Sequence, residues 1–413
     1  MHIIQSPLFD FDSFIKKKGN DRLVVILEAL PAERLLSVLE NEHWTGRKGY
    51  PARGMWSAII AGVLNQANSL SDVIRLLKRD KDTRLVCGFS LDDIPDHDAL
   101  RRFLKKLVKH ADLLDKCFSD LVSEARGALP GFGDTLAVDA TDIKAHSNGH
   151  RKTPSDPDAR WGAKGAGHHS GPSRDKKQRD LYYWFGYKLH LVVDTLYELP
   201  VSFEITPANE SDTTHMESLL KKAGADREET RPKAVIADKG FDSKSNSQFV
   251  FNECHAVPII PIRERAGEQL PDICNAKGTP LCGCGLDMTY WGRDGDYLKY
   301  RCPEAVGKGI CKARFKCSPS SYGYVLKLPV ASDPRRHPPV PRESKKWARL
   351  YRMRTAVERV NSRVKEQLGL GNITLRGITK VTVRSILSLL VMLAAAVGMA
   401  RRNRLSELRL LVT

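Results

Sequence analysis

The sequence predicts a mixed α/β domain that follows an N-terminal helical domain and is interrupted by a cysteine-containing insertion. Three observations lead to this prediction. Residues 1–130 have apolar side chains at helical spacing, whereas residues 131–262 contain short runs rich in Val, Ile and Leu that are typical of strands. Residues 263–342 hold most of the cysteines and many prolines, and residues 343–413 return to helical spacing.

The N-terminal region contains three helical patterns, at residues 54–66, 69–80 and 94–110. In the last of them, Asp96 precedes a basic helix and is its predicted N-cap. A helix-turn-helix-like DNA-binding role for residues 71–110 and a role as a plain scaffold fit this pattern equally well.

Five apolar runs follow in the α/β region, and the first two are separated by a segment of different composition. This segment, residues 146–180, has no Val, Leu, Ile or Phe, so it is predicted to be mobile because it buries too little surface. A later apolar run, residues 385–400, is shorter than the ~20 residues of a membrane span, which favours a buried core helix. The five runs are residues 134–145, 184–194, 197–206, 232–240 and 256–262.

The formal net charge is +17, and the surplus is concentrated near the C-terminal end. Residues 331–413 contain 18 basic and 5 acidic residues, which predicts a polyanionic partner such as nucleic acid. A solvated basic face is the alternative interpretation. The nine cysteines, five of them within residues 282–317, do not form the pattern of a secreted disulfide framework. We therefore expect a cytoplasmic protein without a membrane partner.

In two of the predicted strands, an aspartate directly follows a run of apolar residues. Asp139 ends the run in "LAVDAT", and Asp238 follows Ala234–Ala237 in "AVIADKG". A buried charge is costly unless it is paired, so two such residues suggest carboxylates that meet on one sheet. The alternative is that each of them caps a turn. This reasoning does not exclude Asp142 or Asp194, which lie near the first strands.

A third acid lies in the most basic helix. Residues 351–365, "YRMRTAVERVNSRVK", contain five basic residues and one acid, Glu358. At ~100° per residue, Tyr351, Arg354, Glu358 and Lys365 fall on one face of a continuous helix, beside an apolar stripe. A simple helix salt bridge is the alternative. The stripe consists of Met353, Val357, Val360, Val364 and Leu368.

Three converging carboxylates would repel one another unless they shared divalent cations. Carboxylates with open coordination suit Mg²⁺ or Mn²⁺, and a pair of such ions is the usual clamp for attack on a phosphodiester. The basic residues around Glu358 would then hold DNA. The hypothesis is a metal-dependent site at Asp139, Asp238 and Glu358 that cuts DNA.

At these residues the sequence resembles bacterial insertion-sequence transposases of the DDE type, which have a ribonuclease-H-like catalytic core. Their Y-x2-R-x3-E-x6-K signature is present at Tyr351, Arg354, Glu358 and Lys365, and the two aspartate strands are similar to theirs. The resemblance covers roughly residues 45–400.

This resemblance implies a metal-binding triad of Asp139, Asp238 and Glu358. It also implies that Tyr351, Arg354 and the signature lysine contact the transposon end. Hydrolysis at the element's ends would free a 3′-OH that attacks target DNA. The implied partners are the double-stranded terminal repeats and target DNA, bound by a homodimer at the nucleoid. The alternatives are a nuclease of the same fold that does not join strands, and a non-catalytic DNA-binding regulator.

Two further groups of residues have an open interpretation. Cys282, Cys302, Cys311 and Cys317 are candidates for structural Zn²⁺, although their spacing is not a repeated C-x2-C; reduced, partly buried cysteines are the alternative. The aromatic run "YYWFGY", residues 182–187, either packs in a core or stacks on unpaired bases.

Overall fold

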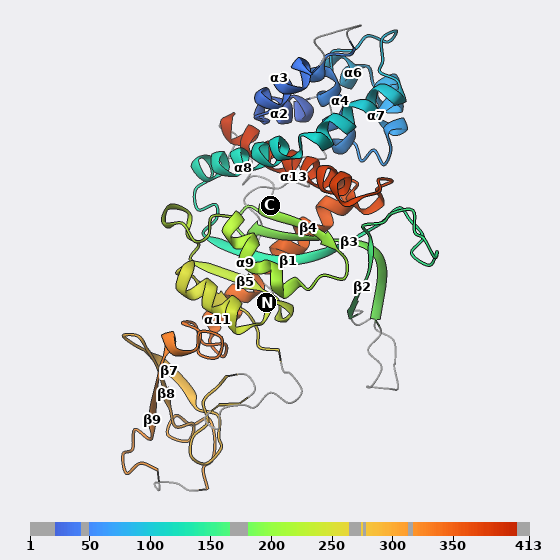
Figure 1. Ribbon diagram of the computed structural model, residues 1–413. Coiled ribbons are helices and arrows are strands. Elements are labelled where there is room, and N and C mark those ends of the chain that lie inside the picture. The colour runs from blue at the N-terminus through green and yellow to red at the C-terminus, as the bar shows by residue number, and fades with distance from the viewer. Residues whose placement is uncertain are drawn as a thin grey trace. The chain divides into compact units, whose positions relative to one another are not determined.

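A computed structural model of the protein describes residues 21–42, 49–165, 181–263, 274–275, 278–312 and 317–402 (Figure 1). The chain divides into two compact units, which we describe separately. The four predicted regions do not follow this division, and their boundaries stay a prediction. The first unit comprises Met1–Phe132, Ala140–Glu210 and Glu358–Thr413, and the second comprises Gly133–Asp139 and Ser211–Val357.

The helices of the first unit pack around one long apolar helix, α13 (Ile378–Arg401). Its most apolar window is long enough to cross a membrane but is completely buried, which confirms the predicted core helix. Figure 1 shows α8 running alongside it. The other helices are α2 (Asp21–Ala29), α3 (Glu33–Asn41), α4 (Ala52–Leu64), α5 (Leu70–Arg79), α6 (Lys81–Val86), α7 (His97–Lys109) and α8 (Ala111–Ala128).

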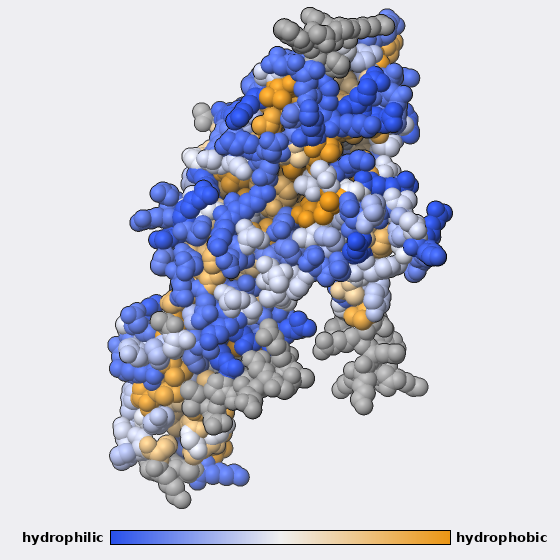
Figure 2. Space-filling view, in the orientation of Figure 1, coloured by the Kyte–Doolittle hydropathy of each residue, from blue (hydrophilic) through white to orange (hydrophobic). Residues whose placement is uncertain are grey.

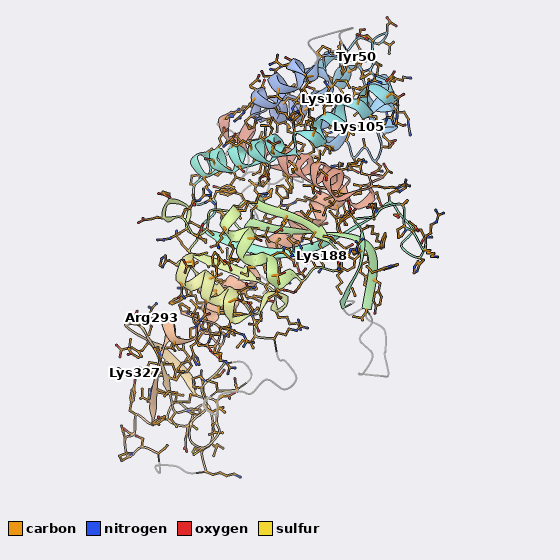
Figure 3. All side chains as sticks on the ribbon, in the orientation of Figure 1. Tyr50, Lys105, Lys106, Lys188, Arg293 and Lys327 are labelled. Carbon is orange, nitrogen blue, oxygen red and sulfur yellow. The ribbon has the colours of Figure 1, made fainter. Side chains whose placement is uncertain are left out.

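Helix α7 begins as its sequence predicts. The Asp96 carboxylate accepts a hydrogen bond from the Ala99 N–H at 2.6 Å, which satisfies one of the donors left free at a helix N-terminus. Apolar residues of α7 face the core, while Lys105 is exposed and Lys106 is half-buried beside Glu42 (Figure 3). The DNA-binding role of this region stays a prediction.

The sheet contains both parallel and antiparallel pairs, as expected for a mixed α/β domain, in the order β2-β3-β1-β5-β6 with β4 on β3. In the first unit, β3 is antiparallel to both β2 and β4. In the second unit, the first half of β1 is parallel to β5, and β5 is parallel to β6. The strands are β1 (Thr135–Lys144), β2 (Arg160–Gly165), β3 (Leu181–Asp194), β4 (Leu199–Pro207), β5 (Ala234–Ala237) and β6 (Val257–Ile259).

The mobility of residues 146–180 stays a prediction; residues 146–165 include strand β2, and residues 166–180 lie outside the described part of the chain. Polar contacts rather than apolar burial hold this segment. The buried Asp156 carboxylate accepts hydrogen bonds from the Tyr187 hydroxyl at 2.7 Å and the Gly377 N–H at 3.1 Å. Asp158 accepts from the Ile378 N–H, at the positive N-terminal end of α13.

The cysteine-containing insertion belongs to the second unit and contains a three-stranded antiparallel sheet. Its small apolar core includes Leu298, Tyr300 and Leu328. Arg293 and Lys327 extend from its strands in Figure 3. The strands are β7 (Thr289–Asp294), β8 (Tyr297–Arg301) and β9 (Val325–Pro329); the unit also has α9 (Asp212–Lys222), α10 (Lys244–Gln248), α11 (Lys345–Arg352) and short helices at Glu228–Thr230, Lys239–Phe241, Phe249–Glu253 and Val330–Ser332.

The signature segment is not the single continuous helix that the sequence predicted. Helix α11 ends at Arg352, and α12 (Thr355–Ser362) begins after a turn. The Thr355 hydroxyl donates to the Arg352 carbonyl at 3.1 Å, a side-chain bond that competes with helical hydrogen bonding. A π-helical turn, η5 (Arg363–Gln367), and a short 3-10 turn, η6 (Leu370–Asn372), follow. A uniform 100° spacing therefore does not apply from residue 351 to residue 365.

Candidate active site

Asp139 and Asp238 occupy equivalent places on neighbouring strands of the second unit. Strand β1 pairs with β5 in parallel, and Val138 is opposite Ala237, so the next residue on each chain is an aspartate. Adjacent strands lie about 4.8 Å apart, and residues in register point to the same face of a sheet. Both residues are only partly buried. The register brings the two chain segments side by side just before the aspartates, and the meeting of their carboxylates stays a prediction.

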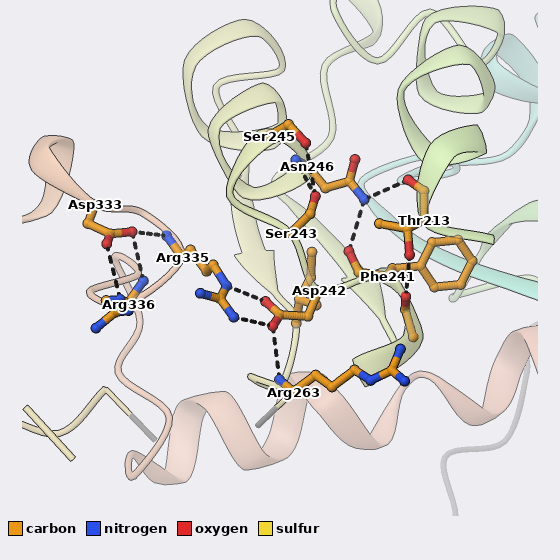
Figure 4. A network of polar contacts seen from close by, with 12 residues as sticks. Thr213, Phe241, Asp242, Ser243, Ser245, Asn246, Arg263, Asp333, Arg335 and Arg336 are labelled. Atoms are coloured by element: carbon orange, nitrogen blue, oxygen red, sulfur yellow. Dashed lines mark hydrogen bonds and ion pairs between the residues drawn. The ribbon is translucent and has the colours of Figure 1, made fainter. Parts of the chain in front are cut away.

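The loop after β5 fixes the Asp238 carboxylate. Asp238 caps the short helix Lys239–Phe241, and its Oδ1 accepts a hydrogen bond from the Gly240 N–H at 2.7 Å. The Thr213 hydroxyl donates to the Gly240 carbonyl at 2.6 Å, and the Asn246 amide donates to the Phe241 carbonyl at 2.9 Å (Figure 4). Backbone groups of this loop are thus held from two different helices.

A buried ion pair fastens the far end of the same loop (Figure 4). The Asp242 side chain is fully buried and accepts two hydrogen bonds from the Arg335 guanidinium, at 2.9 and 2.7 Å. Asp242 also accepts from the Arg263 N–H at 2.9 Å. Arg342 donates to the Ile260 carbonyl at 2.9 Å and to the Arg335 carbonyl at 2.6 Å. These contacts join the two ends of the cysteine-containing insertion to the Asp238 loop.

The competing acids near the first strands have other partners. Asp142 forms ion pairs with Lys164 at 2.6 Å and with Lys365 at 3.0 Å. Asp194 is buried and accepts hydrogen bonds from the N–H groups of Leu196 and Tyr197, as a turn cap does. The β1–β5 register, in which Asp139 directly follows the pair Val138–Ala237, is what favours Asp139 as the strand-borne acid of the site.

The ion pair of Asp142 includes one of the signature residues. Burial alone would raise the pKa of Asp142, but the hydrogen bonds and positive charges of Lys164 and Lys365 lower it to about 2. Burial lowers the pKa of Lys365, and the charge of Asp142 opposes that effect. Asp142 is thus ionised at neutral pH. In this state of the protein, Lys365 is held by a carboxylate of the first unit.

The aromatic and basic residues of α11 lie in the second unit. The rings of Trp347 and Tyr351 are stacked, with centroids 4.8 Å apart and planes 16° apart. The Arg354 guanidinium lies 5.8 Å from the centre of the Tyr351 ring. Two of the signature side chains are therefore neighbours: Tyr351 lies on α11, which also carries the exposed Lys345 and Lys346, and Arg354 lies in the turn that follows this helix.

Glu358 lies in α12, where it is solvent-exposed. The residues after it anchor the helix: Arg359 donates to the Glu198 carboxylate at 2.5 Å, and Arg363 forms an ion pair with it at 2.6 Å. Glu198 is buried and has a positive φ of 57° in the turn between β3 and β4. Sequence reasoning missed Glu198, because nothing in the local pattern of "YELPV" links it to residues so distant in the chain.

Paired carboxylates at Asp139 and Asp238 are oxygen ligands of the kind that Mg²⁺ prefers. Within the described ranges, no three or more His, Cys, Asp or Glu side chains are arranged to hold a metal ion. Asp139 and Asp238 belong to the second unit, and Glu358 begins the last segment of the first unit. The convergence of all three carboxylates stays a prediction.

The predicted zinc ligands of the insertion, Cys282, Cys302, Cys311 and Cys317, stay a prediction. The hydrogen bond between Cys284 and Cys311 raises the pKa of Cys284 to about 11, and Cys282 and Cys317 add to this effect. Cys302 is not among these neighbours; it is buried, and its N–H donates to the Tyr324 carbonyl. The described residues contain no metal-binding arrangement, which leaves zinc without structural support.

The comparisons with known proteins identify the family. The family model described as "Transposase DDE domain" matches residues 130–394. The chain belongs to the DDE transposase family. A second model, "Transposase domain (DUF772)", matches residues 9–106 of the transposase. The fold is therefore ribonuclease-H-like, and the protein is a DNA transposase that uses divalent metal ions, generally Mg²⁺.

Other comparisons add little to this identification. No curated protein matches the transposase. One solved structure that matches is described as "Cryo-EM structure of piggyBac transposase synaptic complex with hairpin DNA". It is 12% identical, and the match covers 95% of this chain and 80% of that chain, with a TM-score of 0.38. A TM-score this low supports no conclusion about the present chain.

Proposed function

We propose that the transposase uses Asp139, Asp238 and Glu358 as its metal-binding carboxylates, cleaves the transposon ends by phosphodiester hydrolysis and joins the resulting 3′-OH to target DNA. The observation that supports this proposal is the β1–β5 register, in which Val138 pairs with Ala237 and an aspartate is the next residue of each segment. Glu358 is included because it is exposed at the surface of an anchored helix and belongs to the signature.

The bound cations, two of Mg²⁺ or Mn²⁺ in this proposal, supply charge neutralisation at the attacked phosphate and at the attacking and leaving oxygens. The residues of the chain position the reactants. Asp139 would present its oxygens from within β1 and Asp238 from the residue that follows β5, and the capping bond from the Gly240 N–H holds the Asp238 oxygen in place. Such fixed geometry contributes to rate because the reacting groups need no reorganisation.

Tyr351, Arg354 and Lys365 would bind the transposon end. Arg354 and Tyr351 present a cation beside an aromatic ring, which suits a phosphate next to a base. Lys365 would exchange its ion pair with Asp142 for a DNA phosphate. The proposed partners are terminal-repeat and target duplexes, bound by a homodimer at the nucleoid, because joining two ends requires two active sites.

Structural zinc is a separate proposal that rests on the cysteines alone. In it, Cys282, Cys302, Cys311 and Cys317 hold the ion. Metal analysis of protein purified without added zinc tests it. A zinc content well below one atom per chain rejects it.

The test of the catalytic proposal uses the full-length transposase, Mg²⁺ and DNA that carries the terminal repeats of its own element. Cleavage of intact ends and joining of pre-cleaved ends are measured separately. We expect Asp139→Asn, Asp238→Asn and Glu358→Gln each to abolish both reactions while DNA binding in EDTA is retained. Asp134→Asn is the matched control, because Asp134 pairs with Lys233 at an exposed position and should leave both reactions intact.

The alternatives give different outcomes in the same experiment. Cleavage of intact ends without joining of pre-cleaved ends indicates a nuclease of the same fold. A protein whose every effect on DNA survives Asp238→Asn is a non-catalytic regulator. Either outcome contradicts the proposal.

A further inference from the structure

Strands β2 and β3 of the first unit carry an aromatic face that the catalytic proposal does not use. The register pairs Trp161 with Phe185 and Ala163 with Tyr183, so these side chains point to the same side of the hairpin. Trp161 is 41% exposed and Tyr183 is 58% exposed. Large aromatic side chains this exposed on one strand pair indicate an interaction site. We call His150, Trp161, Tyr183 and Phe185 the aromatic face.

The rings of the aromatic face are held in a fixed arrangement. Trp161 lies between His150, with ring centroids 4.8 Å apart, and Phe185, with centroids 5.6 Å apart. The Trp161 indole N–H donates to the Gly149 carbonyl at 3.4 Å. A Cβ atom at Gly149 would lie 2.5 Å from the Phe185 ring, so the backbone approaches that ring as closely as glycine allows. The exposed indole is thus supported from below and at its edges.

Charges around the aromatic face favour an anionic polymer. Both acids of the described segment 145–165 are engaged with the first unit's own backbone, since Asp156 binds the Gly377 N–H and Asp158 binds the Ile378 N–H. Its cations include Arg151 and Lys152, which are both exposed. On the opposite side of the strand pair, Lys164 and Lys144 lie over the Tyr182 ring, at 5.3 and 5.7 Å.

The hairpin is tied to the signature lysine. Lys164 on β2 shares the Asp142 carboxylate with Lys365, at 2.6 and 3.0 Å. Figure 2 shows pale and orange residues over the strands β2 and β3. Exposed aromatic rings on a surface that also carries cations are what proteins use to stack on unpaired bases, because every base offers a π-face.

From these observations we infer that the aromatic face binds an unpaired nucleobase of the DNA substrate, which stacks on Trp161 while neighbouring cations hold the backbone. The inference rests on DNA being the substrate of the transposase and is independent of the three carboxylates. It assigns to Trp161 and Tyr183 a part in binding single-stranded or locally opened DNA. The buried partners of the run, Trp184 and Tyr187, instead belong to the core.

Fluorescence anisotropy of labelled DNA tests the inference with the full-length transposase in EDTA, so that catalysis plays no part. The probes are a 20-nucleotide oligo(dT) and a duplex of the same length. We expect Trp161→Ala to weaken oligo(dT) binding by about 5- to 150-fold, the loss that follows truncation of one stacking aromatic. Trp161→Phe should recover most of the affinity, and duplex binding should change by less than threefold.

Two further variants keep the outcome decisive. Tyr183→Ala removes a more exposed ring and should also weaken oligo(dT) binding. Trp291→Ala is the matched control, because Trp291 is 48% exposed on β7 of the second unit and should leave oligo(dT) binding unchanged.

Three results would overturn the inference. The first is oligo(dT) binding by folded Trp161→Ala and Tyr183→Ala within twofold of the wild type. The second is an equal loss in Trp291→Ala. The third is a change of oligomeric state in Trp161→Ala, measured by sedimentation, with unchanged oligo(dT) binding; that result identifies a second copy of the chain as the occupant. EDTA removes catalysis, so a negative result in the oligo(dT) experiment does not contradict the carboxylate proposal. Conversely, the cleavage experiment on the aspartate variants does not test base stacking on Trp161.

Discussion

The ion pair between Asp242 and Arg335 predicts the largest single effect on the second unit. Arg335→Met removes two hydrogen bonds, of 2.9 and 2.7 Å, from a carboxylate whose side chain is 0% exposed. Breaking a buried ion pair by removing one partner costs about 3–5 kcal/mol, since the remaining charge is left in an apolar setting. Because the Arg263 N–H still donates to Asp242 in the variant, we expect a loss of stability near the lower end of this range.

Hydrogen exchange of the β5 amides measures this loss within the second unit. A decrease of 3–5 kcal/mol accelerates exchange by about 150- to 5,000-fold where exchange follows the opening equilibrium. Arg293→Met is the matched control: its pair with Asp296, at 3.3 Å, is exposed, and such pairs contribute about 0–1 kcal/mol. Combining Arg335→Met with Asp242→Asn should restore part of the stability, because the two residues are coupled.

The same variant tests the link to the active site. Loosening the Asp242 end of the loop should weaken the hold on Asp238, and we expect end cleavage to fall more than DNA binding does. The reasoning is refuted if β5 exchange in Arg335→Met stays within threefold of the Arg293→Met control, or if the double variant is no more stable than the single one.

Three other predictions concern the signature residues and their supports. Arg354→Ala should reduce the slope of log affinity against log salt by about one unit, and an unchanged slope in a binding titration would exclude a phosphate contact. The pKa of Asp142 is about 2, below its ordinary value, so the stability from its lysine pairs is complete above about pH 4 and lost as pH falls toward 2. On acidification, the free energy of unfolding of Asp142→Asn should therefore fall by up to about 2 kcal/mol less than that of the wild type. An equal fall in both proteins would contradict the ion pairs. Glu198→Gln leaves two arginines without their charge partner and should destabilise the first unit by about 3–5 kcal/mol, whereas Glu217→Gln, in an exposed pair with Lys221, should cost about 0–1 kcal/mol in the same urea titration.

The strands and their aspartates were predictable because the signal is local. A buried parallel strand is a short continuous apolar run, and an acid at its end is visible in four or five letters, as at Asp238. The core helix α13 was predictable for the same reason. The pairing of Val138 with Ala237 was not, since register depends on contacts between residues nearly a hundred positions apart.

The signature helix shows where periodicity fails. Four of the five predicted stripe residues are buried, so the apolar face was correct: Val357, Val360, Val364 and Leu368. The break before Thr355 and the π-helical turn at Arg363–Gln367 were not predicted, because a uniform helical period assumes one unbroken helix.

The polar supports of the site were beyond sequence reasoning. Glu198 binds Arg359 across 161 residues, and Asp242 binds Arg335 across 93. The order of residues 146–165 likewise comes from Asp156 and Asp158 binding backbone more than 200 residues away. A prediction from composition considers only how much apolar surface a segment can bury, whereas hydrogen bonds hold this segment.

Iron-mediated cleavage of the protein backbone tests the shared metal site most directly. Fe²⁺ replaces Mg²⁺ in the full-length transposase, ascorbate and peroxide generate hydroxyl radicals at the bound ion, and mass spectrometry maps the cuts. The account predicts cuts next to Asp139, Asp238 and Glu358 together, all suppressed by excess Mg²⁺ and all lost in Asp238→Asn. Cuts at the two aspartates without one at Glu358, or cuts that persist in Asp238→Asn, would contradict a site built from these three carboxylates.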